Sequence, residues 1–266
     1  MSLLQGYTIP RTPAGRASLV PAPPWHYVGD FLVVDFWADP DAAASVLPEG
    51  LEPHPDGGRC AAVFADWQSC SEHGDELLDP VRSHYREFYL VVNALLDGEE
   101  VTTCPFIWVD QDFALARGWI QGFPKKLGEV WVTRAYDLEC RAAPGIREGS
   151  RFGGTCSARG HRLAQARVTL ERPSEEGSAH TSPPIVNVRH FARLAAGRHD
   201  DPQVHELVQT VSRDRAVSEV WEGAAELELL PTPGEEHTLL TPVRTGRGVR
   251  FTFAYTVDDL RTVKEL

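Results

Sequence analysis

The chain has 266 residues and a formal net charge of −12, and 42% of its residues are hydrophobic. Its acidic surplus repels a phosphate backbone, and no basic patch interleaved with aromatic residues occurs, so nucleic acid is not an expected partner. No apolar run approaches the roughly 18 residues of a membrane helix, and the N-terminus lacks a basic segment followed by an unbroken apolar block. We expect a cytoplasmic protein without a membrane partner.

The length of the chain suits one sizeable core, because β-rich chains of this size commonly form a single domain. We therefore expect one domain over residues 1–266, with residues 1–24 as an irregular, proline-rich arm of the kind that serves assembly. The five cysteines are odd in number, dispersed and without a CxxC pair. This pattern favours reduced thiols over a disulfide framework or a zinc site.

The predicted elements begin with an apolar strand at residues 31–37. Asp39 and Pro40 then supply an N-cap and a proline at the first helical position, which predicts a short helix that ends near residues 48–50. Runs rich in strand-forming residues between turn signals predict further strands at residues 61–67, 87–95, 101–109, 128–136, 138–143, 151–159, 161–172, 209–216, 224–230 and 249–257. Many short strands separated by glycine and proline turns are typical of a barrel or sandwich.

Two more helices and a closing turn complete the predicted elements. Asp112 can cap a brief helix through Ala116, and a second helix is predicted over residues 188–196. The polar run RPSEEGSAHTS and the Pro-Pro pair after it mark the longest loop. The last nine residues, DDLRTVKEL, predict a closing helical turn.

The segment IQGFPKKLGEV, residues 120–130, sets two adjacent lysines among apolar residues and turn signals. Pro124 fixes its own φ and pushes Phe123 toward extended geometry, so Lys125 and Lys126 should begin a short strand. Neighbours on a strand face opposite ways. One lysine can therefore enter an apolar interior while the other faces solvent or a subunit surface, and the pattern alone does not say which.

A lysine that enters the interior is a candidate nucleophile, and that chemistry needs a neutral amine. At the reference pKa of about 10.4, only roughly one free lysine in 2,500 is deprotonated at pH 7. A second ammonium about 10 Å away lowers the pKa of the lysine by roughly 1.7 kcal/mol, or just over one unit, whereas desolvation can lower it by about 3–5 units. An apolar wall must therefore supply most of the decrease in pKa. The candidates for this wall are Trp108, Phe113, Trp119, Phe123 and Trp131. The alternative is a pair of surface lysines that flank a turn.

The segment GFPKKLG closely resembles the active-site signature of the acetoacetate decarboxylase superfamily. Three other stretches are similar in the same order and together span most of the chain: VLPEGL at residues 46–51, YRE at 85–87 and VWEGAAELEL at 220–229. The resemblance implies a mainly β (α+β) fold, an acetoacetate decarboxylase-like β-barrel with a few peripheral helices. It also implies a Schiff-base lyase that needs no cofactor and assembles as a homo-oligomer, a dimer or a tetramer.

The resemblance also assigns roles by position in the motifs. The first lysine of the pair, Lys125, forms the Schiff base, and Glu87 of the YRE stretch is the candidate acid and base. Lys126 supports the neutral form of Lys125 electrostatically. The alternative for Glu87 is an exposed carboxylate that pairs with nearby arginines: Arg82, Arg86 and Arg117.

The sequence departs from the decarboxylating members of the superfamily. Those members carry an arginine near the first strand that receives the substrate carboxylate, but no arginine occurs from Pro21 to Gly58. Two of their acidic positions fall on Ala61 and Trp119. The charge set that would expel carbon dioxide is incomplete, so we expect a pyruvate aldolase-dehydratase rather than an acetoacetate decarboxylase.

Candidate substrate contacts for a small keto acid and an aldehyde are Gln121, Tyr85, Tyr255, Trp119 and Phe123. The same iminium serves both activities, because it stabilises either the carbanion left by decarboxylation or the enamine formed by loss of a methyl proton. For the aldol reaction an amide or a phenol must orient the carboxylate or the aldehyde oxygen. Gln121 can instead cap a turn, and Tyr255 can be an ordinary strand residue in RFTFAYTV.

Other site types find no support in the sequence. The histidines show no HxH, HExxH or HxxxH spacing, and no GxSxG elbow or P-loop occurs, so metal catalysis, serine hydrolysis and nucleotide use are not expected. Two functions remain as alternatives to the aldolase-dehydratase. One is decarboxylation of acetoacetate or a related 3-oxo acid, and the other is a non-catalytic barrel that binds a keto acid or another small metabolite.

Overall fold

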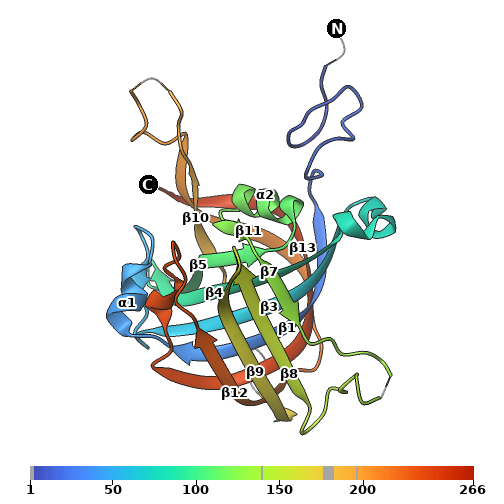
Figure 1. Cartoon of the computed structure of the whole chain (residues 1–266). Helices are drawn as coiled ribbons and strands as arrows, with labels where there is room; N and C mark the ends of the chain where they lie inside the picture. The colour runs from blue at the N-terminus through green and yellow to red at the C-terminus, as the bar shows by residue number, and fades with distance from the viewer. Residues whose placement is uncertain (1–2, 139, 176–182, 196) are drawn as a thin grey trace.

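A computed structural model of the chain describes residues 3–138, 140–175, 183–195 and 197–266. Over these residues the chain is mainly β, with one large sheet and a few short helices outside it (Figure 1). The strands are β1 (Trp25–Trp37), β2 (Glu52–Pro53), β3 (Arg59–Ser71), β4 (His84–Leu96), β5 (Glu99–Val109), β6 (Lys125–Leu127), β7 (Glu129–Val132), β8 (Arg151–Ala158), β9 (His161–Pro173), β10 (Val186–Phe191), β11 (Val204–Val217), β12 (Trp221–Leu229) and β13 (Arg244–Glu265). The α-helices are α1 (Pro40–Ser45) and α2 (Asp112–Ile120), and the 3₁₀ turns are η1 (Asp75–Leu78), η2 (Pro80–Arg82) and η4 (His237–Leu240).

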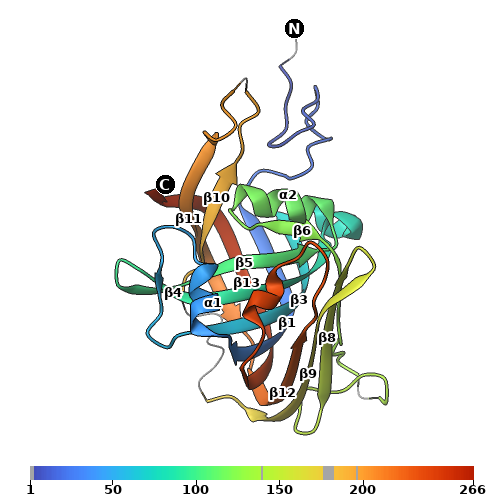
Figure 2. The same ribbon diagram turned by 60° about the vertical axis from the view of Figure 1, so that its left-hand side comes forward.

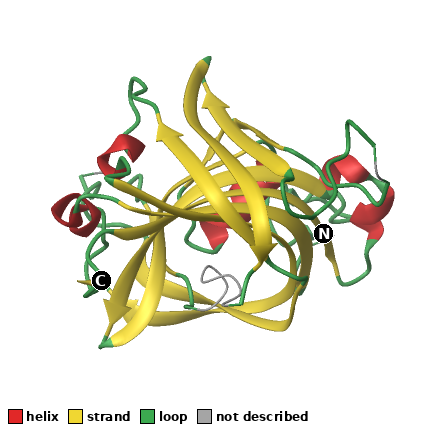
Figure 3. Cartoon of the chain, turned by 90° about the horizontal axis from the view of Figure 1, so that it is seen from below, coloured by secondary structure: helices red, strands yellow, loops and turns green. Residues whose placement is uncertain are grey.

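The main path of the sheet runs β6-β5-β4-β3-β1-β13-β12-β9-β8-β7. Seen from below, its strands curve around the interior (Figure 3). The predicted mainly β fold is confirmed, but the predicted barrel does not close, because β6 and β7 do not pair within the described residues. The chain turns between them at Gly128, whose N–H donates to the Val109 carbonyl of β5 at 2.8 Å. Because β6 pairs with β5 and β7 pairs with β8, the two ends of the sheet are joined by the chain through Gly128 and not by a ladder of hydrogen bonds.

Side chains alternate between the two faces of the central strands, and this alternation determines on which face Glu87 lies. Residues 32, 34, 62, 64, 88 and 90 of β1, β3 and β4 pack into one core, whereas residues 31, 33, 63, 65, 85 and 89 pack into a second core on the opposite face. Glu87 belongs to the second face because it alternates with residues 85 and 89. Both faces of these strands are buried, so a charged residue here is enclosed by the fold.

Helix α1 begins as predicted. The Asp39 carboxylate accepts hydrogen bonds from the N–H groups of Asp41 and Ala42 at 3.0 and 3.1 Å, and Pro40 is the first helical residue. The helix ends at Ser45, earlier than expected. None of the helices in the described part of the chain has the length and apolar composition that a membrane crossing requires.

Helix α2 is longer than predicted, because it runs to Ile120 rather than to Ala116. Asp112 is not its cap: the cap position is Gln111, and the Asp112 carboxylate accepts the N–H of the next residue. The helix lies across one end of the curled sheet, next to β6 (Figure 2). The four extra residues include Arg117, which the helix buries.

The helix predicted over residues 188–196 is wrong, and so is the closing helical turn. Residues 186–191 form β10, which pairs with β11, and the C-terminal residues 258–265 continue β13 along the other side of β11. Strand pairing with a distant segment overrides the local helical pattern. Residue 196 lies outside the described residues, as do residues 176–182 of the predicted long loop.

The predicted strands are found, most of them longer than predicted, with two exceptions. Residues 133–136 leave the sheet after β7, and residues 138–143 hold an isolated bridge between Cys140 and Ala143 in place of a strand, with residue 139 outside the described residues. An alternating pattern forms a ladder only where a neighbouring strand supplies hydrogen bonds. The arm at residues 3–24 is irregular, as expected, apart from a bridge between Gln5 and Thr12.

Candidate active site

The two lysines open strand β6, as predicted, and face opposite sides of it. The Lys125 side chain is 8% exposed and enters the interior, whereas the Lys126 side chain is 44% exposed. Gly122 turns the chain between α2 and β6 with a φ of +82°, and a Cβ there would lie 2.8 Å from Val208. The turn therefore requires glycine for its conformation and for the space it leaves.

Helix α2 forms the floor under the Lys125 side chain. A Cβ at Gly118 would lie 2.3 Å from Cδ and 2.6 Å from Cε of Lys125, far inside van der Waals contact. The lysine stem therefore crosses the helix where a side chain is missing. Around its amine lie aromatic rings, because Nζ is 5.2 Å from the ring centroid of Tyr85 and 5.8 Å from that of Phe123.

Glu87 contacts the amine of Lys125 directly. Nζ donates a hydrogen bond to Oε2 at 2.9 Å, and the second carboxylate oxygen accepts one from the Trp67 indole at 2.7 Å. Both the lysine and the glutamate side chains are 8% exposed. The two groups that the motifs single out therefore form a buried pair whose carboxylate is held in place by a tryptophan.

The alternative interpretation of Glu87, as an exposed carboxylate paired with an arginine, is wrong. Arg86 faces the other side of β4 and pairs with Asp110 at 2.8 Å, and Arg82 lies 3.9 Å from a carboxylate of η1. The third candidate, Arg117, bonds to a serine. Alternation along β4 separates Glu87 from its arginine neighbour in the sequence.

Arg117 is a buried cation near the pair that the sequence analysis did not consider as a substrate contact. It is 3% exposed, and its guanidinium carbon lies 4.7 Å from the ring centroid of Tyr27 and 5.6 Å from that of Tyr85. Its Nη2 donates to the Ser69 hydroxyl at 3.0 Å. Burial opposes its charge, but the phenols of Tyr27, Tyr85 and Tyr255 outweigh that effect and raise the pKa of Arg117.

The signal for Arg117 was present but hidden by the predicted end of the helix. Phe113, Arg117 and Gln121 are spaced four residues apart, which places them on one face of a helix. That face is visible only if α2 continues beyond residue 116. Once it does, the turn and strand that follow bring Lys125 to the same end of the helix as Arg117 and Gln121.

Gln121 ends α2, as one of its two interpretations predicts, and its role as a substrate contact stays a prediction. Its backbone N–H donates to the carbonyls of Arg117 and Gly118 at 3.3 and 3.0 Å. Its side chain is buried, donates to the Arg117 carbonyl at 3.4 Å and bonds to the Tyr27 phenol. The amide is therefore fixed between the backbone of α2 and Tyr27, over whose ring the Arg117 guanidinium lies.

Near the pair lie the buried phenol of Tyr85 and the partly buried phenol of Tyr255. Burial raises the pKa of each well above its ordinary value, and the nearby Glu87 carboxylate raises both further. Tyr255 stacks on Tyr27 at a centroid distance of 4.9 Å. At neutral pH both phenols keep their protons and can donate hydrogen bonds.

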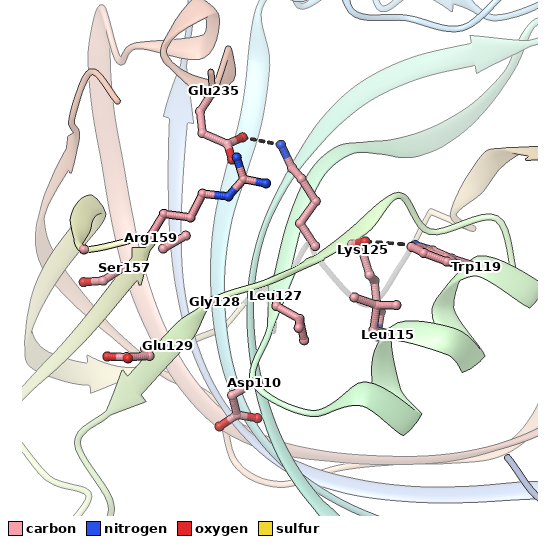
Figure 4. Close-up of a pocket in the computed structure, with 13 residues that line it drawn as sticks. Asp110, Leu115, Trp119, Lys125, Leu127, Gly128, Glu129, Ser157, Arg159 and Glu235 are labelled. Atoms are coloured by element: carbon pink, nitrogen blue, oxygen red, sulfur yellow. Dashed lines mark hydrogen bonds and ion pairs between the residues drawn. The ribbon is translucent and has the colours of Figure 1, made fainter. Parts of the chain in front are cut away.

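Trp119 and Lys126 line a cleft on the outer side of β6, in which Figure 4 shows Trp119 and Glu235. The Trp119 indole donates to the backbone carbonyl of Lys125 at 2.8 Å and is 49% exposed, and Lys126 forms an ion pair with Glu235. The cleft here, about 780 Å³, is the larger of the two that adjoin the lysine segment. The structure places neither residue in the cavity that holds Glu87, and a carboxylate offsets the charge of Lys126.

The cavity that contains Glu87 is smaller, with a volume of about 170 Å³. Its walls are mainly aromatic: Phe31, Trp67, Tyr89, Phe123, Phe253 and Tyr255. Lys125 itself lines the outer cleft, but its amine bonds to Glu87 in the wall of this smaller cavity, so we assign the site to the smaller cavity. Among the described residues, no three side chains of His, Cys, Asp or Glu cluster as a metal site.

The predicted apolar wall is found in part. Phe123 lies near the Lys125 amine, and Phe113 packs against Tyr85 in the same core. Trp108 is buried on the opposite face of β5, and Trp131 is 60% exposed. The lysine is therefore enclosed by the rings of Tyr85 and Phe123 and by the backbone of α2.

Comparisons with known proteins identify the family. The family model described as acetoacetate decarboxylase (ADC) matches residues 8–266. The chain belongs to the acetoacetate decarboxylase family. This assignment confirms the resemblance found in the motifs and the expectation of a lyase. A comparison with curated protein sequences gave no match.

Solved structures of family relatives are similar over nearly the whole chain. The enduracididine biosynthesis enzyme MppR, in complex with the condensation product of pyruvate and imidazole 4-carboxaldehyde, is 33% identical, with a TM-score of 0.92 over 99% of this chain and 98% of that one. MppR in complex with pyruvate is also 33% identical, with a TM-score of 0.91 over 99% of each chain. An acetoacetate decarboxylase-like enzyme from Sphingomonas wittichii RW1 is 28% identical, with a TM-score of 0.90 over 98% of this chain and 100% of that one.

The contact between Gly118 and Lys125 gives a first test of this family member's site. A helix-interior glycine replaced by alanine is normally stabilising by up to about 1 kcal/mol. In Gly118→Ala the new methyl group must instead displace the lysine stem, so we expect borohydride trapping of pyruvate on Lys125 to slow strongly. Gly145→Ala, where a Cβ meets only Arg147 at 4.0 Å, is the control. Trapping at the wild-type rate in Gly118→Ala would contradict the packing described.

The buried phenols predict a loss of stability at alkaline pH. Because their pKa is raised in the folded state, they stay protonated above pH 10 while the unfolded chain releases these protons. The free energy of unfolding therefore keeps its full value below about pH 10. Above that pH it falls by up to about 1.4 kcal/mol per pH unit for each phenol. Urea unfolding from pH 9 to pH 11 should show a smaller loss for Tyr255→Phe than for the wild type. Tyr7→Phe, at an exposed phenol, is the control, and equal losses in all three proteins would be evidence against this account.

Proposed function

We propose that this enzyme condenses pyruvate with an aldehyde and removes water from the adduct, with Lys125 as the nucleophile. The observation that carries the proposal is the 2.9 Å contact between Lys125 Nζ and Glu87 Oε2 in an aromatic interior. The structures of MppR with pyruvate and with a condensation product of pyruvate and an aldehyde support the same chemistry here.

The first step is activation of Lys125 by Glu87. Transfer of a proton from Nζ to Oε2 converts the ion pair into a neutral amine beside a carboxylic acid, and burial favours the neutral forms. The amine then attacks the ketone carbon of pyruvate, and the carboxylic acid returns its proton to the former ketone oxygen. A second proton passes from the nitrogen to the same oxygen, again through Glu87, and the oxygen leaves as water. The product is an iminium that joins Lys125 to that carbon.

Glu87 also moves the proton in the carbon–carbon bond-forming steps. Its carboxylate removes a proton from the methyl group of the iminium, which gives an enamine. The enamine carbon attacks the aldehyde carbon, and the aldehyde oxygen takes up a proton. Loss of this hydroxyl as water and hydrolysis of the iminium release a 2-oxo acid with a double bond conjugated to its ketone, so one water is formed per pair of substrates.

Arg117 and Gln121 are the proposed ligands of the pyruvate carboxylate, and Tyr85 and Tyr255 are the proposed donors to the aldehyde oxygen. The arginine supplies the cation that is missing between residues 21 and 58, and the amide lies beside it. Both phenols keep their protons at neutral pH, as donors must.

The second candidate function, decarboxylation of acetoacetate or a related 3-oxo acid, fits this arrangement less well. The two acidic positions of the decarboxylating members are occupied here by Ala61 and Trp119, so the charge set that would expel carbon dioxide is incomplete even with Arg117 as the cation. Condensation leaves the carboxylate intact and needs no such charges. This difference favours aldol chemistry.

We further propose a cytoplasmic homo-oligomer. All five cysteines are free and three of them are buried, and free thiols suit a reducing compartment. The arm at residues 3–24 exposes Leu3, Leu4 and Ile9, which supports a role in assembly.

Borohydride trapping tests the proposed nucleophile. Incubation with pyruvate followed by reduction should add one reduced pyruvate to the intact chain, and Lys125→Ala should abolish the adduct. Lys126→Ala, which removes the outward-facing neighbour, should retain it. An aromatic aldehyde added with pyruvate should give a new conjugated absorbance. Carbon dioxide release from acetoacetate without that absorbance would favour the decarboxylase, and no adduct with any keto acid would favour the binding protein.

Exchange of the pyruvate methyl protons tests the proposed role of Glu87. In deuterated buffer without aldehyde, the wild type should exchange these protons through the enamine, as followed by NMR. Glu87→Gln keeps the shape of the side chain but removes the base, so exchange should fall by about 10²–10⁴. Glu235→Gln, which alters the carboxylate bound to the other lysine, should exchange normally. Exchange in Glu87→Gln at the wild-type rate would show that another group moves the proton.

A further inference from the structure

The cavity has one wall that differs chemically from the others. Strand β11 contributes polar side chains to it, Gln209, Thr210, Ser212 and Arg215, whereas the facing walls are mainly aromatic. Among the described residues that line the cavity, Glu87 is the only acid. A group bound against β11 therefore meets hydrogen-bonding side chains and a cation, with no carboxylate on that wall.

A β-bulge brings Arg215 to this wall. The pairing of β11 with β13 passes from Arg213 opposite Thr256 to Ala216 opposite Ala254, so three steps along β11 match two along β13. Within the bulge Asp214 has a φ of +52°, a left-handed conformation that is uncommon for residues other than glycine. Bulges of this kind occur next to active sites, where they redirect a side chain.

The guanidinium of Arg215 lies over the aromatic part of the cavity. Its carbon is 5.6 Å from the ring centroid of Phe253, which stacks on Tyr255 at 5.2 Å. Burial raises the pKa of the Tyr255 phenol, and the charge of Arg215 partly opposes that rise, so this charge acts on the proposed aldehyde donor. The cation and the phenol therefore belong to one substrate-binding surface.

On the basis of the proposed function, we propose that the second substrate is a planar aromatic aldehyde that carries a carboxylate, and that Arg215 binds this carboxylate. Phe253 stacks on Tyr255 and meets Phe31 edge to face, so the aromatic wall offers contacts that fit a flat ring, and the small cavity limits the ring to a compact one. A guanidinium presents planar donors that match a carboxylate, and the amide of Gln209 and the hydroxyl of Ser212 add donors on the same strand.

The net charge of −12 does not prevent binding of an anion here. Charges beyond about 8 Å are screened at physiological ionic strength, so the groups within the cavity decide. The acidic neighbour Asp214 forms an ion pair with Arg213, which also bonds to Asp258 at 2.9 Å. The two charged neighbours of Arg215 in the bulge, Arg213 and Asp214, therefore pair with each other.

The test compares two aldehydes of nearly the same shape, 4-formylbenzoate and the neutral 4-formylbenzamide, at saturating pyruvate. The wild-type kcat/KM should be at least about tenfold higher for the benzoate, mainly through KM. Arg215→Gln should lower kcat/KM for the benzoate far more than for the benzamide, and Arg215→Lys should retain part of the preference. Arg213→Gln removes a charge from the same strand outside the cavity and should keep the wild-type preference.

The outcomes separate this inference from the proposed function. Borohydride trapping of pyruvate on Lys125 requires no aldehyde, so a missing adduct overturns the proposed function itself. An enzyme that traps pyruvate but shows no preference for the benzoate, or turns over neither aldehyde, overturns only the role of Arg215. A preference that survives in Arg215→Gln overturns it as well, because another group must then bind the carboxylate.

Discussion

The contact between Lys125 Nζ and Glu87 Oε2 joins two groups that would each be costly to bury alone. Moving either charge away from water has a large penalty, which the partner offsets only if the two stay close and well aligned. The fold meets this requirement from both sides, because Trp67 holds the carboxylate and Gly118 leaves space for the lysine stem. A pair held this way can exchange a proton within the interior, and the same exchange prepares the amine for attack.

Helix α2 and strand β6 act as one unit that sets the geometry of the site. On the inner side, α2 supplies Arg117 and Gln121 and passes beneath the lysine stem. On the outer side, the Trp119 indole bonds to the backbone of Lys125, and the ion pair of Lys126 with Glu235 ties β6 to the segment before η4. The outward residues thus add contacts to the strand whose other face carries the nucleophile, and the electrostatic support expected of Lys126 stays a prediction.

Local signals made the lysine strand, the cap of α1 and most long strands predictable. Pro124 and the flanking glycines act within a few residues, so β6 follows from the sequence alone. Segments whose structure depends on a distant partner were not predictable: β10 and the end of β13 are strands because β11 lies between them. Arg117 was missed for a related reason, since its place on the helix face with Gln121 depends on where α2 ends. The open sheet likewise depends on how far β6 extends.

The most direct test of the central claim is a crystal structure of the enzyme soaked with pyruvate. The account predicts continuous density between Lys125 Nζ and the ketone carbon of pyruvate, with the carboxylate against Arg117 and the methyl group next to Glu87. Pyruvate bound without a covalent bond, or seated in the outer cleft beside Lys126, would contradict it.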